Sequence, residues 1–447
     1  MSLRSLFVLA WLMLLGLQAA ARGQDPPGLS SRELVALTGK LRSKQVSTRQ
    51  EAIKLLSEHP EQDTAKALID IGLVDPAPEI RQAAYDALLK FRNHREATDF
   101  VLQRVRKPAR GPLNDAIGPL LYAFLLSSDL PEVYEPALSL LDEGANAGKL
   151  APAFAVNMAD MLAVHHQALD VVALTRLTDT NLGSHFVVRR TVVRALSLVD
   201  DKSAIDALIG LLDKFRGEAQ ADVMEYLEVI SPQGFERPAQ WTAWWIANKE
   251  SFTFPPFVAR PTVRTITVSL NNSEAFYYGL PIFAKRLVFV IDASGSMSGD
   301  RIVAAKRELS AAVQQLKSDV RFNILVFNGA VMPWKNELIE ATTANKAQAI
   351  NFIPAITPAS NTATYSALAA ALKFEAEAIY LLTDGAPTSG QYVQPDDIVE
   401  AVSKTNMTRR ESIYTIGIGV GERGNPFDSF LKNLAERNRG VYRRVDE

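Results

Sequence analysis

The chain of 447 residues contains no cysteine, which excludes several kinds of site at once. Without cysteine there are no disulfides, no thiolate metal ligands, no cysteine nucleophile and no cysteine for lipid attachment. The chain also lacks an excess of basic residues, because 48 Lys and Arg against 50 Asp and Glu give a formal charge of −2. This balance supplies no basic surface and therefore argues against nucleic-acid binding.

Histidine is scarce, and all five histidines fall in the amino-terminal half of the chain: His59, His94, His165, His166 and His185. His165 and His166 are adjacent, so on a helix they project about 100° apart and cannot share a metal as an i, i+4 pair could. We expect all five to be surface or packing residues rather than zinc ligands. The carboxyl-terminal part of the chain therefore has no imidazole to serve as ligand or base.

A long apolar run occurs only at the amino terminus, where Arg4 precedes the run 6–17 and the small residues Ala19 and Ala21 follow. This pattern predicts a signal peptide over residues 1–21, cleaved before Arg22, because the run is shorter than the roughly 20 residues of a membrane-spanning helix. The alternative is an uncleaved membrane anchor. We expect a secreted or periplasmic protein without an integral membrane span after cleavage, and a secreted chain without cysteine favours a bacterial origin.

Residues 30–250 are expected to form a helical domain with a repeating pattern. Arg49, Arg81 and Arg189 each stand near the start of a predicted helix and precede pairs of small and large apolar residues. Arg49 and Arg81 lie 32 positions apart, and Asp75-Pro76 precedes the second of these helices. These units resemble HEAT repeats, whose second helix commonly begins Asp-Pro, then Val/Ile-Arg, then Ala-Ala and Ala-Leu. The resemblance implies an α-solenoid whose concave surface docks another protein.

The predicted closing helix of this domain carries Trp241, Trp244 and Trp245 at helical spacing. We interpret them as a capping core, with a binding patch as the alternative, because aromatic residues at this spacing usually pack inward. Residues 251–284 then change to proline pairs and to the alternating pattern of 262–268. This segment is predicted to be a linker with one extended strand that packs on the edge of the next domain.

Strands and helices alternate from residue 285 to residue 447, which predicts a doubly wound, Rossmann-like parallel sheet covered by helices on both faces. At this length the chain as a whole is multidomain, with two to four domains. The expected strands are 287–291, 321–327, 378–382, 412–418 and 441–445. The expected helices are 301–317, 346–352, 365–373, 395–407 and 427–437.

Asp292, Ser294 and Ser296 follow directly on the apolar strand 287–291. The carboxyl ends of parallel strands are where open α/β folds place their ligands. One carboxylate and two hydroxyls are hard oxygen donors, which suit Mg²⁺ or Mn²⁺ rather than zinc or copper. The sequence therefore predicts a divalent-cation site at the switch point of the sheet.

Three segments in order carry a specific resemblance: 292–297 (Asp-Ala-Ser-Gly-Ser-Met), Thr362 ahead of 365–368 (Tyr-Ser-Ala-Leu), and 382–385 (Leu-Thr-Asp-Gly). Over about 160 residues the chain is similar to the von Willebrand factor A family. By this resemblance, a metal-ion-dependent adhesion site takes its oxygen ligands from Asp292, Ser294, Ser296, Thr362 and Asp384. The family often has glycines before the second-loop threonine where this chain has Ser360-Asn361, so Thr364 stays open as an alternative to Thr362.

The resemblance and the charge balance favour binding over catalysis. Two carboxylates only balance the charge of a dication, and if one of them acts through water the ion stays electron-poor, with an open position for a carboxylate of a partner protein. The helical repeats are expected to provide a second docking surface. A Mg²⁺-dependent hydrolase of phosphate esters is the alternative, although it needs a general base or a second metal that the sequence does not offer. A third possibility is a scaffold whose A domain binds its own helical half.

Two further motifs are expected to be structural. Asp300 is interpreted as the N-cap of the helix that begins near Arg301, and not as a metal ligand. Residues 419–424 match G-x-G-x-x-G, but they follow the penultimate strand instead of the first. We therefore expect this glycine run to be a turn rather than a dinucleotide site.

Overall fold

The computed structural model describes residues 28–107, 112–165, 170–255 and 275–446. The predicted signal peptide, the predicted strand 262–268 and His166 lie outside the described residues. Contacts divide the chain into two compact units, residues 1–140 and 141–447. In the part of the chain that the structure describes, no helix combines the length and the apolar character needed to cross a membrane.

The first unit is helical throughout its described residues. Its elements are α2 (Ser31–Leu41), α3 (Val46–Leu56), α4 (Gln62–Ala67), the π-helical turn η1 (Leu68–Gly72), α5 (Pro78–Leu89), α6 (Arg95–Arg106), α7 (Pro112–Leu126) and the first part of α8 (Pro131–Asn146). Ser30 and Glu33 form a reciprocal capping box that starts α2. Helix α3 packs on α2 and α5, and α4 packs on α6, so helices pack on their neighbours along the chain.

The arginines that mark the repeat pattern have structural partners in this unit. The Arg49 guanidinium forms a buried pair with Asp75, with Nε–Oδ2 at 2.8 Å and Nη2–Oδ1 at 3.0 Å. Arg81 donates to the carbonyl oxygen of Asp75 at 2.7 Å, and Pro78 occupies the first turn of α5. Both arginines therefore hold the Asp75-Pro76 turn. The assignment to HEAT repeats remains a prediction.

The second unit begins with helices and ends with the α/β domain. After α8 it contains α9 (Pro152–His165), α10 (Asp170–Asp179), the 3₁₀ turn η2 (Asn181–Ser184), α11 (Phe186–Leu196), α12 (Lys202–Lys214), α13 (Glu218–Ile230) and α14 (Pro238–Asn248). Helix α11 packs on α9 and α13, and α12 packs on α14. The described part of the chain before Ser251 thus forms helices, as the sequence predicts.

The tryptophans of α14 pack inward, so their interpretation as a core is confirmed. Trp241 and Trp245 are buried, while Trp244 is half-buried. The indole of Trp241 donates to the carbonyl oxygen of Phe235 at 3.1 Å, and that of Trp245 donates to Asp206 of α12 at 2.8 Å. Both polar edges are satisfied, as buried indoles require.

The α/β domain is built on one mixed sheet with the order β5-β4-β3-β7-β8-β9, in which β3, β4, β7, β8 and β9 are parallel. These five strands are β3 (Arg286–Asp292), β4 (Arg321–Phe327), β7 (Ala378–Thr383), β8 (Ser412–Ile418) and β9 (Tyr442–Val445). The short antiparallel strands β5 (Val331–Pro333) and β6 (Ile339–Glu340) both pair with β4. The doubly wound prediction is confirmed, and β5 and β6 are additions to it.

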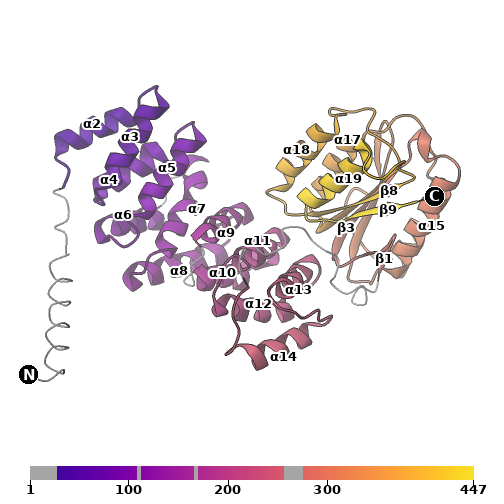
Figure 1. The fold of residues 1–447 in the computed structure, drawn as a ribbon, viewed down its shortest axis with the longest axis horizontal. Helices are drawn as coiled ribbons and strands as arrows, with labels where there is room; N and C mark the ends of the chain where they lie inside the picture. The colour runs from indigo at the N-terminus through magenta and orange to yellow at the C-terminus, as the bar shows by residue number, and fades with distance from the viewer. Residues whose placement is uncertain (1–27, 108–111, 166–169, 256–274, 447) are drawn as a thin grey trace, which may run out of the picture. The chain divides into compact units, whose positions relative to one another are not determined.

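Helices cover both faces of the sheet (Figure 1). The helical elements are η4 (Gly295–Met297), α15 (Asp300–Gln315), α16 (Thr343–Phe352), η5 (Ile353–Ala355), α17 (Thr364–Ala371), η6 (Leu372–Phe374), α18 (Pro395–Asn406) and α19 (Pro426–Arg437). Leu287, Phe289 and Ile291 share a core with α15, with α16 and with the hairpin of β1 (Phe276–Tyr277) and β2 (Leu280–Pro281). Val288 and Val290 face α17, α18 and α19. This alternation explains why β3 is apolar at every position between its ends.

The helices of the second unit contact the α/β domain at the edge where the parallel strands begin. The buried carboxylate of Glu218, the first residue of α13, accepts hydrogen bonds from Ser412 Oγ at 3.0 Å and from Tyr414 OH at 3.0 Å. Asp222 accepts from Arg439 at 3.0 Å. The carboxyl-terminal ends of the parallel strands, at the opposite end of the sheet, take no part in these contacts.

One local prediction is wrong. Asp300 is the first residue inside α15 and its side chain is exposed, whereas Gly299 is the N-cap, at φ 80°. A positive φ is favourable for glycine and unfavourable for aspartate, so the chain turns one residue earlier than we predicted. The glycine run 419–424 forms the connection between β8 and α19, in line with the turn interpretation.

Candidate metal centre

The carboxylate of Asp292 is fixed at the end of β3 by two donors. Its Oδ1 accepts the backbone N–H of Ser294 at 2.7 Å, and its Oδ2 accepts the hydroxyl of Thr383 at 2.5 Å. Asp292 pairs in register with Phe327 of β4, and β7 runs alongside on the other side. Three neighbouring strand ends therefore determine where this carboxylate lies.

The serines of the first loop connect Asp292 to the third loop. Ser294 Oγ and Ser296 Oγ lie 3.1 Å apart, and Ser296 Oγ donates to Asp384 Oδ1 at 2.8 Å. The second oxygen of Asp384, Oδ2, accepts from Arg301 Nη1 at 2.8 Å. Four of the five residues that the sequence predicts as ligands are thus joined by short contacts.

The second loop contacts both of the other loops. Thr362 is buried, its N–H donates to Thr388 Oγ1 at 2.9 Å, and its carbonyl oxygen accepts from the N–H of Thr388 at 2.9 Å. The carbonyl oxygen of Ser360 accepts from the N–H of Gly295 at 3.2 Å. Thr364 is the first residue of α17, and its buried hydroxyl has no hydrogen-bond partner among the described residues.

The site combines buried carboxylates with an accessible side. Asp292, Ser294 and Asp384 are buried, whereas Ser296 is exposed. Burial raises the pKa of Asp292 to about 6, and the nearby Asp384 carboxylate acts in the same direction, while hydrogen bonds from Thr383 and Ser294 favour the charged form. Two buried acids close together are unfavourable without a cation, and the guanidinium of Arg301 already fills that role for Asp384.

The donor set fits a hard divalent cation. It offers carboxylate and hydroxyl oxygens, which such a cation prefers. The described residues contain no group of three or more His, Cys, Asp or Glu side chains that could hold a metal ion, so hydroxyl oxygens would have to complete the coordination here. Asp292, Ser294 and Ser296 from the first loop and Asp384 from the third would hold such an ion, with a threonine from the second loop. The exposed side of Ser296 would leave room for a ligand from outside the chain.

Sequence reasoning missed three residues that shape this site: Thr383, Arg301 and Thr388. Thr383 is the polar last residue of the otherwise apolar strand β7 and directly precedes the predicted ligand Asp384. This position was the signal available in the sequence. Arg301 stands at the start of a predicted helix, and no local pattern shows that its guanidinium reaches the third loop. Thr388 lies in a loop without a recognisable motif, and we see no sequence signal for its role.

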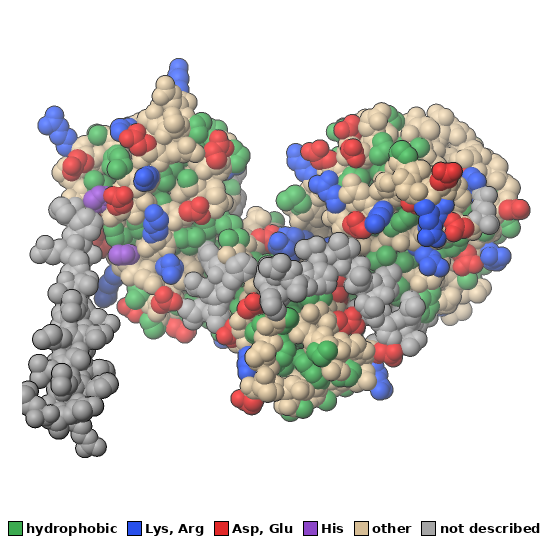
Figure 2. Space-filling model, in the orientation of Figure 1, with side chains coloured by type: hydrophobic (Ala, Val, Ile, Leu, Met, Phe, Trp, Pro, Cys, Tyr) green, Lys and Arg blue, Asp and Glu red, His purple; other side chains and the backbone are tan. Residues whose placement is uncertain are grey.

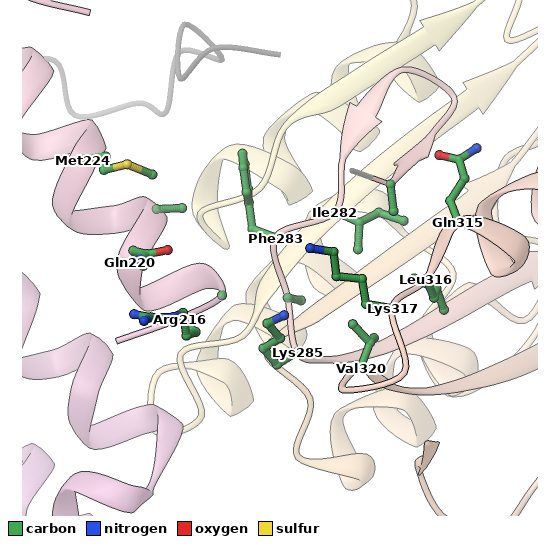
Figure 3. Close-up of a pocket in the computed structure, with 14 residues that line it drawn as sticks. Arg216, Gln220, Met224, Ile282, Phe283, Lys285, Gln315, Leu316, Lys317 and Val320 are labelled. Carbon is green, nitrogen blue, oxygen red and sulfur yellow. The ribbon is translucent and has the colours of Figure 1, made fainter. Parts of the chain in front are cut away.

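A separate cavity of about 220 Å³ lies at the opposite end of the sheet, among the residues that precede the strands (Figure 3). Arg216, Lys285 and Lys317 line it. The basic groups there already have partners within the chain: Lys285 Nζ lies 2.7 Å from Asp319 Oδ2, and Arg216 donates to the carbonyl oxygen of Asp213 at 2.9 Å. We therefore place the candidate site at the end of β3 that carries Asp292.

The described surface shown in Figure 2 mixes basic and acidic side chains over both the helices and the α/β domain. No large patch of one sign gathers among the described residues of this face. This distribution agrees with the formal charge of −2, and the described residues of this face form no continuous basic track for a polyanion.

The comparison with known families decides the identity of the α/β domain. Residues 285–444 match the family model described as von Willebrand factor type A domain. These residues form a von Willebrand factor A domain. The resemblance seen in the sequence is thereby confirmed for this part of the chain.

Curated relatives match a stretch of this chain of comparable length. The chain is similar to inter-alpha-trypsin inhibitor heavy chain H3 of Mesocricetus auratus, with 32% identity over 182 residues that cover 38% of this chain and 20% of that protein. It is similar to inter alpha-trypsin inhibitor heavy chain 4 of Mus musculus, with 32% identity over 184 residues that cover 38% of this chain and 19% of that protein. The chain thus spans about a fifth of the length of these relatives.

Two solved structures are similar over the same share of the chain. One is the von Willebrand factor type A protein from Catenulispora acidiphila, with 21% identity, a TM-score of 0.33 and coverage of 37% of this chain and 40% of that chain. The other is the PilB minor pilin from Streptococcus sanguinis, with 13% identity, a TM-score of 0.29 and coverage of 36% of this chain and 56% of that chain.

Proposed function

We propose that this chain is a non-enzymatic protein-binding module whose A domain binds an acidic partner through a divalent cation. The observation that carries the proposal is the contact between two loops, in which the Ser296 hydroxyl donates to Asp384 and lies 3.1 Å from the hydroxyl of Ser294. The proposed ligands of Mg²⁺ or Mn²⁺ are Asp292, Ser294, Ser296, Thr362 and Asp384. When bound, the cation would supply a coordination position for a carboxylate of the partner.

The residues around the site support binding rather than hydrolysis. Asp292 and Asp384 each accept two hydrogen bonds, which leaves neither carboxylate poised as a general base. The A domain also contains no histidine. We therefore favour an adhesive role over the hydrolase alternative.

The helical part of the chain supplies the second half of the proposal. Its HEAT-like repeats would provide a second docking surface, as solenoids do through their concave faces. The scaffold alternative, an A domain that binds its own helical half, has some support in the contacts of Glu218 and Asp222 with the A domain. These contacts involve the beginning of β8 and the residues before β9, so they would not compete with a partner at the metal site. We also propose that the chain acts outside the cytoplasm, in the secreted or periplasmic space.

Calorimetric titration of Mg²⁺ and Mn²⁺ into the full chain tests the metal claim. The parent protein should bind one cation, and Asp292→Ala and Ser294→Ala should each weaken binding by tenfold or more. Ser298→Ala is a matched control, because Ser298 follows η4 with an exposed side chain. Undiminished binding in Asp292→Ala would refute the assignment of this site.

A further inference from the structure

Arg301 reaches the candidate metal centre from a position that the family motif does not include. It is the second residue of α15, whose N-cap is Gly299. Its Nη1 lies 2.8 Å from Asp384 Oδ2, and its side chain is 29% exposed while that of Asp384 is fully buried. The guanidinium therefore lies between a buried carboxylate of the site and the solvent.

The pairing with Arg301 changes the charge of the site. Asp292 and Asp384 contribute −2 and Arg301 contributes +1, so the three side chains sum to −1. When a dication binds, the summed charge becomes +1. Without Arg301 the same binding would bring the summed charge from −2 to zero. Asp300 is exposed and directed to solvent, so water screens its charge more strongly.

A positive guanidinium next to the site has opposite effects on the two ligands. It repels a dication through a partly buried environment, where charges interact more strongly than in water. It attracts a carboxylate, for which the planar guanidinium is the preferred partner among cationic side chains. Arg301 and the exposed Ser296 both donate to Asp384, so the guanidinium lies next to the exposed part of the site, where we expect a partner to bind.

We propose that Arg301 couples the two binding steps of this site, by weakening the binding of the cation alone and strengthening the binding of a carboxylate to the cation-loaded site. This inference rests on the proposed function. Its consequence is that the site binds cation and acidic ligand as a pair, and that either one alone binds weakly. By linkage, a carboxylate then raises the affinity for the cation by the same factor by which the cation raises the affinity for the carboxylate.

The test is a calorimetric titration of Mn²⁺ into the full chain, in sodium acetate and in sodium chloride of the same ionic strength. The parent protein should bind Mn²⁺ more tightly in acetate. Arg301→Gln should bind Mn²⁺ about tenfold more tightly than the parent in chloride, and the enhancement by acetate should fall at least about threefold. Arg307→Gln is the matched control, because Arg307 lies on the same helix with a largely exposed side chain next to Glu308.

Arg301→Lys separates charge from packing and guards against a folding defect in Arg301→Gln. It keeps the positive charge, so its Mn²⁺ affinity in chloride should equal that of the parent, while it lacks the planar fork that pairs with a carboxylate. The enhancement by acetate should therefore lie between those of the parent and Arg301→Gln.

The outcomes distinguish this inference from the proposed function. Unchanged or weaker Mn²⁺ binding by folded Arg301→Gln, with Asp292→Ala still defective, would overturn the role of Arg301 and leave the metal site in place. A tenfold gain in Arg301→Lys would also overturn it, because the charge would then be irrelevant. Wild-type Mn²⁺ binding by Asp292→Ala would overturn both claims.

Discussion

Thr383 and Asp292 stand side by side at the ends of two adjacent parallel strands, and the threonine hydroxyl donates a 2.5 Å hydrogen bond to Asp292 Oδ2. The other oxygen of Asp292 accepts the N–H of Ser294. The carboxylate is thereby held in one orientation before any ligand arrives. Such fixed orientation of a metal ligand by a neighbouring group is a common source of affinity.

The first prediction concerns Thr383 itself. Thr383→Val keeps the shape of the side chain but removes the donor, so Asp292 loses its orientation and the affinity for Mn²⁺ should fall about tenfold. Calorimetry measures this change. Thr415→Val is a control of similar burial, since its hydroxyl donates to the carbonyl oxygen of Leu431 at 2.8 Å, away from the site. Equal Mn²⁺ affinities in the two variants would contradict the role of Thr383.

The second prediction decides between the two threonines of the second loop. Thr362→Val should weaken Mn²⁺ binding by tenfold or more, because it removes a proposed ligand. Thr364→Val should leave the affinity unchanged, and it should not destabilise the fold, because its hydroxyl has no hydrogen-bond partner among the described residues. The reverse pattern in the same titration would assign the ligand to Thr364.

The third prediction is a dependence of stability on pH from Glu377. Burial raises the pKa of Glu377 from 4.5 to about 7, and the charge of Glu218 acts in the same direction, while the N–H of Lys285 favours the charged form. The folded state therefore holds this proton more tightly than the unfolded chain. The resulting stabilisation is complete below the unfolded pKa of 4.5, and it decreases as pH rises through about 7, by on the order of 3 kcal/mol.

Comparison with Glu377→Gln isolates this contribution. The variant keeps an oxygen acceptor for the N–H of Lys285 but does not ionise, so it should match the parent in acid and exceed its free energy of unfolding above neutral pH. Urea denaturation across this pH range provides the measurement. Glu400→Gln, at an exposed position of α18, should follow the parent at every pH. A constant difference between Glu377→Gln and the parent would rule out the titration of Glu377.

The fourth prediction concerns the ion pair between Arg190 of α11 and Asp222 of α13. Nε–Oδ2 measures 2.6 Å, and both side chains are 1% exposed. Asp222→Ala removes the nearest carboxylate of a buried guanidinium and leaves only the more distant Glu218 Oε2, at 3.8 Å, so it should lower the free energy of unfolding by about 3 kcal/mol. The exposed pair of Arg95 and Asp99 is the contrast, and Asp99→Ala should change stability by less than about 1 kcal/mol in the same urea titration. Similar losses in both variants would show that burial is not the deciding factor.

The main strands were predictable because each carries a physical signature in the sequence. Strand β3 is apolar at every position from Leu287 to Ile291, which is the mark of a strand covered on both faces. The short strands β5 and β6 were not predictable, since two or three residues at an edge carry no such run and their pairing depends on β4. Pairing between strands is a tertiary property that local patterns describe poorly.

The candidate site shows a similar division. The loop after β3 and the loop after β7 were found because an acidic or hydroxyl residue follows directly on an apolar strand, and their convergence follows from the parallel topology. The ion pair of Arg301 with Asp384 joins residues 83 positions apart, and no local rule brings them together. The N-cap of α15 was misplaced because a local rule was applied alone. Aspartate is a preferred N-cap residue, but the backbone turns with a positive φ, which Gly299 provides.

The two lateral borders of the sheet have a consequence for behaviour at high concentration. On one side, the short strands β5 and β6 pair with only part of β4, and β5 ends at the exposed Pro333. On the other side, β9 carries Arg443 and Arg444. Proline and charged side chains on an edge strand discourage a strand of another molecule from joining the sheet. Both borders of the sheet in the A domain therefore carry features that oppose growth into β-aggregates.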